Sequence, residues 1–194
     1  MTMGKLVQLR PEVRVEELSD VALVAACATS DRAARALLFE RHVDAVHRFV
    51  GRMRGADPDT VDDLVQATFI SAFQSAGRFH GDRAISWLYG IAANHVRAYA
   101  RREIRRKRAL LSISDASQVD WHARPLAVNP ALLARLPSAI AELPHDLRAS
   151  FVLVDLEEER GKDAAAALGI PEGTLWRRVF HARKALRDAL GGDA

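Results

Sequence analysis

The stretch ISWLYGIAANHVRAYARREIRRKR, residues 85–108, joins an apolar, aromatic segment to a dense run of arginines. Its first half repeats apolar residues at intervals of three and four, which is the pattern of a helix with one buried face. From residue 97 onward it carries seven basic residues against the single acid Glu103. The stretch therefore predicts a core helix with a positively charged extension, and a phosphate backbone is the partner that this charge favours.

Three aromatic residues, Phe79, Trp87 and Tyr89, lie at or just before the start of this helix. Flat rings beside a basic track can stack on unpaired bases, and each such stack contributes about 1–3 kcal/mol. Aromatic residues at helical spacing are, however, more often part of a core. For Trp87 both interpretations stay open.

Composition and charge set limits on the class of protein. The chain has 194 residues, of which 49% are hydrophobic and 27% charged, as expected for one or two globular domains. Its net charge of +3 is unevenly distributed, because residues 97–108 and 160–188 are basic and the remainder is acidic. A single cysteine, Cys27, excludes an internal disulfide and fits a reducing compartment. With no signal-peptide pattern and no long apolar run, we expect a soluble, cytoplasmic protein without direct membrane insertion.

The hydrophobic period is helical almost throughout, so we expect an all-α fold of two helical domains joined by a flexible linker. Residues 18–111 are expected to form a four-helix bundle after an N-terminal extension, residues 1–17. Its first helix begins near Ser19 or Asp20, with Val21, Leu23, Val24 and Cys27 inward. Residues 112–130 are polar, contain two prolines and lack a sustained period, which indicates a linker.

The second domain, residues 131–194, carries a helix-turn-helix pattern. Helices are expected at about 131–142, 145–158, 162–168 and 172–190, with a tight turn at Gly169-Ile170-Pro171. In the last helix the apolar spacing buries Leu175, Val179, Ala182, Leu186 and Leu190. Its exposed face should then present a set of side chains to the DNA major groove: Thr174, Trp176, Arg177, Arg178, His181 and Lys184.

Three ordered segments carry a family resemblance: DDLVQATFISAF at 62–73, WLYGIAANHVRAYARR at 87–102, and LPHDLRASFVLVDL with LGIPEGTLWRRVFHARKALRDAL at 143–156 and 168–190. Together they resemble an extracytoplasmic-function (group IV) sigma factor of bacterial RNA polymerase, across about residues 18–190. The resemblance implies a sigma region 2-like domain and a sigma region 4-like domain. It also implies three partners: core RNA polymerase, promoter DNA, and an anti-sigma factor.

The same resemblance assigns roles residue by residue. Polymerase docking is implied for Asp62, Asp63, Gln66 and Phe69, although Phe69 is equally compatible with the core. The loop 76–84, with Phe79 and His80, would hold a base flipped from the melted −10 element. The adjoining DNA would be lined by Trp87, Asn94, Arg97, Arg101, Arg102 and Arg105, while residues 174–184 would contact the −35 duplex. The bulky Trp176 and the pair Arg177-Arg178 depart from the smaller or single basic residues that the family usually has here, which leaves the preferred −35 sequence open.

Two other classes of function can be weighed. A conventional helix-turn-helix regulator would explain residues 162–190 but would leave the aromatic-basic segment and DDLVQATF without a role. An enzyme is the weaker alternative, because the chain has no phosphate-binding loop and no nucleophile-elbow motif. His42 and His47 are five residues apart, which does not place them on one helical face as metal ligands. We therefore expect no catalysis, no metal and no cofactor.

Overall fold

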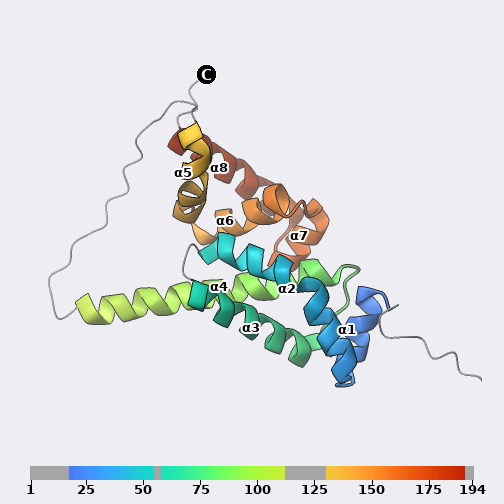
Figure 1. Ribbon diagram of the computed structural model, residues 1–194. Coiled ribbons are helices and arrows are strands. Elements are labelled where there is room, and N and C mark those ends of the chain that lie inside the picture. The colour runs from blue at the N-terminus through green and yellow to red at the C-terminus, as the bar shows by residue number, and fades with distance from the viewer. Residues whose placement is uncertain (1–17, 55–57, 112–129, 191–194) are drawn as a thin grey trace, which may run out of the picture.

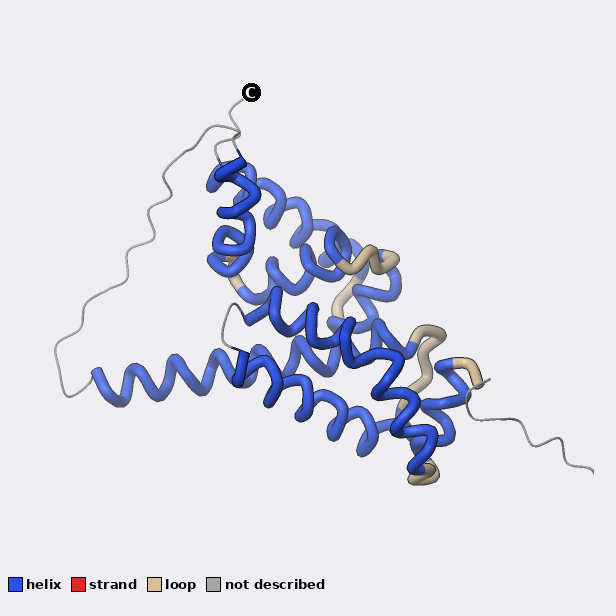
Figure 2. Tube along the Cα trace, in the orientation of Figure 1, coloured by secondary structure: helices blue, strands red, loops and turns tan. Residues whose placement is uncertain are grey.

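The computed structural model describes residues 18–54, 58–111 and 130–190 (Figure 1). The first part consists of α1 (Asp20–Ala28), α2 (Arg32–Arg54), α3 (Pro58–Ser75), the short 3₁₀ helix η2 (Ala76–Arg78) and α4 (Ala84–Leu111). The second consists of α5 (Pro130–Glu142), α6 (His145–Phe151), the π-helical turn η3 (Val152–Leu156), α7 (Gly161–Leu168) and α8 (Glu172–Leu190). Within these residues there are helices and turns and no strand, which confirms the all-α expectation (Figure 2).

Helix boundaries follow the capping chemistry of the sequence. Ser19 is the N-cap of α1, since its Oγ accepts a hydrogen bond from the backbone N–H of Ala22 at 3.3 Å. At the other end of the chain, Gly169 closes α7 in a left-handed conformation with φ of 63°. That turn sets the angle between α7 and α8, the two helices of the predicted helix-turn-helix.

The unit formed by α1–α4 encloses a core between α2, α3 and α4. Its fully buried side chains include Val46, Phe49, Val50, Leu88, Ala92 and Ala72. A smaller cluster joins Leu23, Val24 and Cys27 of α1 to Leu38 of α2 and Ala84 of α4. The expectation that Val21 points inward is wrong: Val21 is 42% exposed, because the buried stripe of α1 runs along Leu23, Val24 and Cys27.

The unit formed by α5–α8 packs α6 against α8, with Leu175, Val179, Ala182 and Leu186 buried as the spacing predicted. Leu190 is only half-buried. The helix expected at 145–158 is a regular α-helix only to Phe151, after which the backbone winds as a π-helix through Leu156. Residues 1–17 and the linker 112–129 lie outside the described residues.

The two units contact each other. Helix α7 lies along α4, and one continuous apolar cluster runs from Val46 and Leu88 to Leu175 and Leu186 (Figure 1). The C-terminal part of α4 instead extends beyond the bundle, where Arg101, Arg102, Arg105 and Arg106 are exposed. The structure thus divides α4 into a packed half and a projecting basic half.

Candidate nucleic-acid and polymerase interface

An apolar groove with an acidic edge lies between α2 and α3. Phe39 and Ile70 are 42% and 49% exposed along it, which is unusual for large apolar side chains. Asp62, Asp63 and Gln66 lie on its edge, all exposed. Phe69 forms the floor, since it is only 2% exposed and packs edge-on against Phe39 with ring centroids 4.8 Å apart.

The groove therefore unites three of the four predicted docking residues at its surface. Phe69 touches the groove but belongs to the core, the second of the two roles left open for it. Sequence reasoning missed Phe39 and Ile70. Ile70 could have been found, because it falls outside the i, i+3, i+4 stripe of the third helix and is a large apolar residue left facing water.

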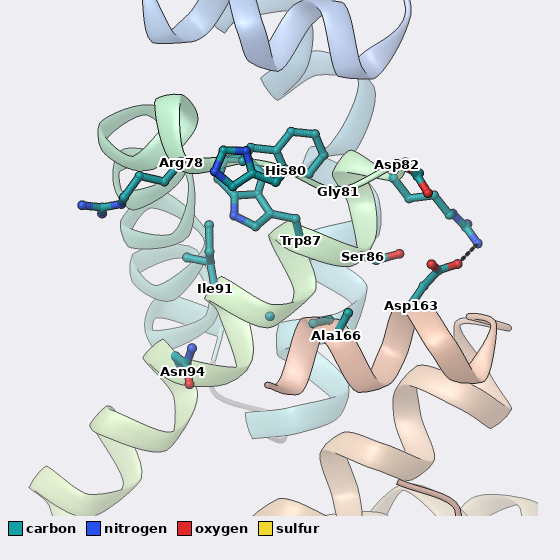
Figure 3. Close-up of a pocket in the computed structure, with 14 residues that line it drawn as sticks. Arg78, His80, Gly81, Asp82, Ser86, Trp87, Ile91, Asn94, Asp163 and Ala166 are labelled. Carbon is teal, nitrogen blue, oxygen red and sulfur yellow. Dashed lines mark ion pairs between the residues drawn. The ribbon is translucent and has the colours of Figure 1, made fainter. Parts of the chain in front are cut away.

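A second cavity of about 460 Å³ lies at the start of α4 (Figure 3). The loop 78–83 forms one wall, and Trp87, Ile91 and Asn94 of α4 form another. Phe79 packs on Trp87 with ring centroids 5.1 Å apart, while His80 is exposed above them. Phe79 and Trp87 thus line one cavity, and Trp87, the residue whose role the sequence left open, is half-buried and contributes to both the core and the cavity. Tyr89, the third aromatic residue considered for base stacking, is 3% exposed and belongs to the core.

Part of the predicted basic track on α4 lies on one side of the helix. Trp87, Ile91, Asn94, Arg101 and Arg105 recur at intervals of three, four and seven, which places them on one side of the helix. Asn94, Arg101, Arg102 and Arg105 are all exposed, so their polar groups face water beyond the cavity. An aromatic cavity followed on the same side of the helix by Arg101 and Arg105 suits a strand with a phosphate backbone and unstacked bases.

Arg97 lies off this line and is not free. It pairs with Asp146 of α6, and Asp146 also accepts a hydrogen bond from Arg178 Nη2 of α8 at 3.2 Å. The expectation that Arg178 lies on the exposed face of α8 is therefore wrong in part, since its side chain is 25% exposed and bound to Asp146. The carboxylate of Asp146 therefore binds two arginines, Arg97 and Arg178, that were predicted to contact DNA.

His145, next to Asp146, is half-buried in the same region. Burial, with the charge of Arg97 in second place, lowers the pKa of His145 to about 4. The side chain is thus neutral at physiological pH.

The remaining face of α8 is open. Trp176, Arg177, His181 and Lys184 are exposed, and Thr174 is half-buried near the start of the helix. Trp176 is fixed in place by a hydrogen bond from its indole N–H to Glu172 Oε1 at 3.2 Å. Phe180, 64% exposed and one turn beyond Trp176, extends this face and was missed, although its spacing of four from Trp176 could have revealed it.

In the part of the chain that the structure describes, no group of three or more histidine, cysteine or acidic side chains could hold a metal ion. Among the described helices, none combines the length and the apolar content needed to cross a membrane.

Comparison with known proteins gives a consistent picture. Residues 38–106 match the family model of sigma-70 region 2, and residues 133–186 match that of sigma-70 region 4. The chain is 35% identical over 176 residues to the ECF RNA polymerase sigma factor SigM of Mycobacterium tuberculosis, covering 90% of this chain and 86% of SigM. It is 30% identical over 185 residues to the ECF RNA polymerase sigma-E factor of Haemophilus influenzae, covering 90% of this chain and 97% of that factor.

Solved structures agree. The structure of CnrH in complex with the cytosolic domain of CnrY aligns with a TM-score of 0.61 and 27% identity, covering 86% of this chain and 94% of CnrH. The sigma factor RpoE of Bartonella quintana, solved with the anti-sigma factor NepR, shares the fold with a TM-score of 0.56 and 24% identity, covering 78% of this chain and 92% of that chain. The chain therefore belongs to the extracytoplasmic-function sigma factors, non-enzymatic initiation factors that direct bacterial RNA polymerase to specific promoters.

Proposed function

We propose that the groove between α2 and α3 is the docking site for core RNA polymerase. Two exposed apolar side chains, Phe39 and Ile70, give it contact area, and Asp62 and Asp63 give it a negative edge. A basic, amphipathic helical surface of the polymerase matches this combination, since charge complementarity orients a partner while the apolar contacts supply affinity. His47 Nε2 lies 3.2 Å from Asp62 Oδ1 and holds that carboxylate at the rim.

The cavity at the start of α4 is the proposed site for a base flipped from the −10 element. Its volume of about 460 Å³ exceeds what one nucleobase needs, and Phe79 and Trp87 offer ring surface inside it. The row Asn94, Arg101 and Arg105 would then guide the backbone of the melted strand away from the cavity. Flipping removes stacking that a duplex otherwise keeps, so these contacts act after the strands begin to separate.

The open face of α8 is the proposed reader of the −35 duplex. Arg177 and His181 lie one turn apart on it, with Lys184 beyond them. In a helix-turn-helix the second helix enters the major groove, where arginine binds guanine edges and lysine more often binds phosphate. In this proposal the loop 78–83 and helix α4 contact melted DNA, and α7 with α8 contact duplex DNA.

Regulation by an anti-sigma factor is part of the proposal. CnrH was solved with CnrY, and this chain aligns with 94% of CnrH. An inhibitor of the present chain would act by covering the groove between α2 and α3 or the exposed face of α8. Because polymerase and promoter are its partners, we also propose that the protein acts in the cytoplasm.

The observation that carries this function is the presence of the docking groove, the aromatic cavity and the helix-turn-helix face on one chain. Run-off transcription on a promoter library, with core polymerase present and absent, tests it. Transcripts from a subset of promoters that require both proteins are expected. Tight sequence-specific duplex binding by the isolated chain, with no effect on polymerase, would instead identify a conventional helix-turn-helix regulator.

A further inference from the structure

Helices α1–α4 form the region 2 unit and helices α5–α8 form the region 4 unit. Acidic side chains of the region 4 unit bind basic side chains of the region 2 unit. Among the described residues, four ion pairs cross the interface: Glu157 with Arg52, Glu159 with Arg83, Asp163 with Arg83, and Asp146 with Arg97. In each pair the carboxylate comes from α6, from α7 or from the segment between them, and the guanidinium comes from α2, α4 or the loop before α4. Carboxylates and DNA phosphates are alternative partners for the same guanidinium geometry.

Glu159 is the most deeply placed of these acids. It is 5% exposed, and its Oε1 accepts a hydrogen bond from Arg83 Nη2 at 3.1 Å while its Oε2 accepts one from the hydroxyl of Ser86. Both oxygens therefore bond to the region 2 unit. A buried carboxylate costs several kcal/mol unless it is paired, so this arrangement is stable only while the two units stay together.

The neighbouring acid makes a similar contact. Tyr89 donates its hydroxyl hydrogen to Glu157 Oε2 at 2.8 Å, and burial together with this bond raises the pKa of Tyr89. Arg148 of α6 donates to the backbone carbonyl of Met53 at the end of α2, at 2.5 Å. Polar contacts thus extend along the interface from α2 to the start of α4.

The backbones of α4 and α7 also fit closely. A Cβ atom at Gly90 would lie 2.3 Å from the carbonyl oxygen of Ala167, a distance that real Cβ atoms do not adopt. Gly90 is therefore required for α7 to approach α4 as it does. Ala166 and Ala167 of α7 lie at this contact, since they line the same cavity as Gly90 of α4.

This contact covers the DNA side of region 2. Asp163, Ala166 and Ala167 of α7 line the same cavity as Phe79 and Trp87 (Figure 3). Asp163 also lies 3.8 Å from Arg83, the loop residue that pairs with Glu159. Helix α3, by contrast, lies on the far side of α2 and α4 from the region 4 unit (Figure 1), and the docking groove is lined by residues of α2 and α3 alone.

We propose that this arrangement is an autoinhibited state, in which region 4 closes over the −10 surface of region 2 and its carboxylates replace DNA phosphates as partners of Arg83 and Arg97. The docking groove stays accessible in this state. Polymerase can therefore bind the closed protein. The closed protein alone holds a melted strand more weakly than the open one, because Arg83 and Arg97 are already paired with carboxylates while Arg101 and Arg105 stay exposed. The inference rests on the proposed function of the loop cavity.

Gly90→Ala is the variant that separates the units. The added methyl group collides with backbone of α7, while alanine within α4 favours the helix by about 1 kcal/mol, so the region 2 fold is kept. Gly51→Ala is the matched control, because a Cβ there meets nothing within 4 Å and the helix gain is the same. Glu159→Gln is a second opening variant, which keeps the side-chain shape but removes the charge that pairs with Arg83.

Two measurements on the chain of residues 1–194 test the autoinhibition. Small-angle scattering should give a larger radius of gyration for Gly90→Ala than for wild type and Gly51→Ala. Fluorescence anisotropy with a labelled mixed-sequence DNA single strand should show a gain in affinity. A closed fraction of about nine in ten predicts a gain of about tenfold, because apparent affinity scales with the competent fraction. Glu159→Gln should give a smaller gain in the same direction.

Unchanged scattering for Gly90→Ala, or an open shape without a gain in single-strand affinity, would overturn the autoinhibition. Failure of the proposed function has a different signature. In that case the radius of gyration still increases, but holoenzyme with wild type or Gly90→Ala produces no promoter-specific transcript.

Discussion

The indole of Trp176 lies directly over Gly161. A Cβ atom at residue 161 would be 2.6 Å from Cζ2 of Trp176, so no other residue fits beneath the ring without displacing it. Glu172 Oε1 accepts the indole hydrogen bond and would itself lie 2.9 Å from the same Cβ atom. Trp176 is still 46% exposed, and it therefore presents a fixed apolar surface on the recognition helix. A ring that is already held loses little side-chain entropy when it meets DNA.

This geometry predicts a thymine preference in the −35 element. The apolar feature of the major groove is the thymine methyl group, and Trp176→Ala removes the ring that would contact it. Discrimination at one −35 position should fall by about 1–3 kcal/mol while the other positions keep theirs. Competitive run-off transcription over a −35 library measures this. Identical base preferences at every position in wild type and variant would contradict the prediction.

Gly161→Ala tests the positioning of the ring without removing it. The methyl group displaces the indole, so the same −35 position should lose selectivity although every DNA-facing side chain is retained. Gly51→Ala serves as the control for an added methyl group in open space. If both alanine variants behave as wild type, the support from Gly161 has no role in recognition.

Reversal of charge on the docking groove should weaken assembly with core polymerase. Asp62→Lys with Asp63→Lys places two cations on the rim that is proposed to face a basic partner, and both carboxylates are exposed, so the fold should be kept. We expect an affinity loss of at least about tenfold, equivalent to about 1.4 kcal/mol. Asp44→Lys, exposed on α2 outside the groove, is the control. Co-purification of the double variant with core at the wild-type level would argue against docking here.

Local chemistry made much of this fold predictable. Helix α8 spans residues 172–190 as its apolar spacing indicated. Leucine, valine and alanine at intervals of three and four can all be buried together only on one face of an α-helix. The turn at Gly169 and the helix N-cap at Ser19 were likewise predictable from the identity of those single residues. The exposed positions of Asn94, Arg101 and Trp176 follow from the same periodicity.

What the sequence could not reveal are the partners across long separations. Arg97 and Arg178 both read as free basic residues, yet both bind Asp146, which is 49 and 32 positions away. The residues next to Gly90 in the sequence do not indicate that the absence of a side chain there lets the backbone of Ala167 approach. The linker composition predicted two units, and it carried no information on the surfaces through which they meet.

The loop cavity should matter more for strand opening than for initial promoter binding. His80 is exposed above the Phe79–Trp87 pair, so His80→Ala leaves the packing of that pair intact. Removing a stacking or edge contact of a flipped base costs about 1–3 kcal/mol once the base has left the duplex. Permanganate footprinting of the −10 region should therefore show fewer open complexes at unchanged initial binding. Gln74→Ala, exposed on α3, is the control, and an equal loss at both stages would count against the prediction.

Acid should destabilise the folded protein through His145. Burial keeps its imidazole neutral in the folded state, with a pKa of about 4, whereas an unfolded histidine has a pKa of about 6.5. Between pH 6.5 and pH 4 His145 binds a proton in the unfolded chain but not in the folded chain. The stability that the folded state gains from a neutral His145 is therefore fully present above pH 6.5 and is lost as the pH falls toward 4. His145→Gln has no such proton to bind, and its free energy of unfolding should vary less between pH 7 and pH 5. Urea unfolding at both pH values measures the difference.

The contacts of Asp146 with Arg97 and Arg178 are common to both proteins. An equal loss of unfolding free energy on acidification in wild type and variant would therefore assign the acid sensitivity to groups other than His145.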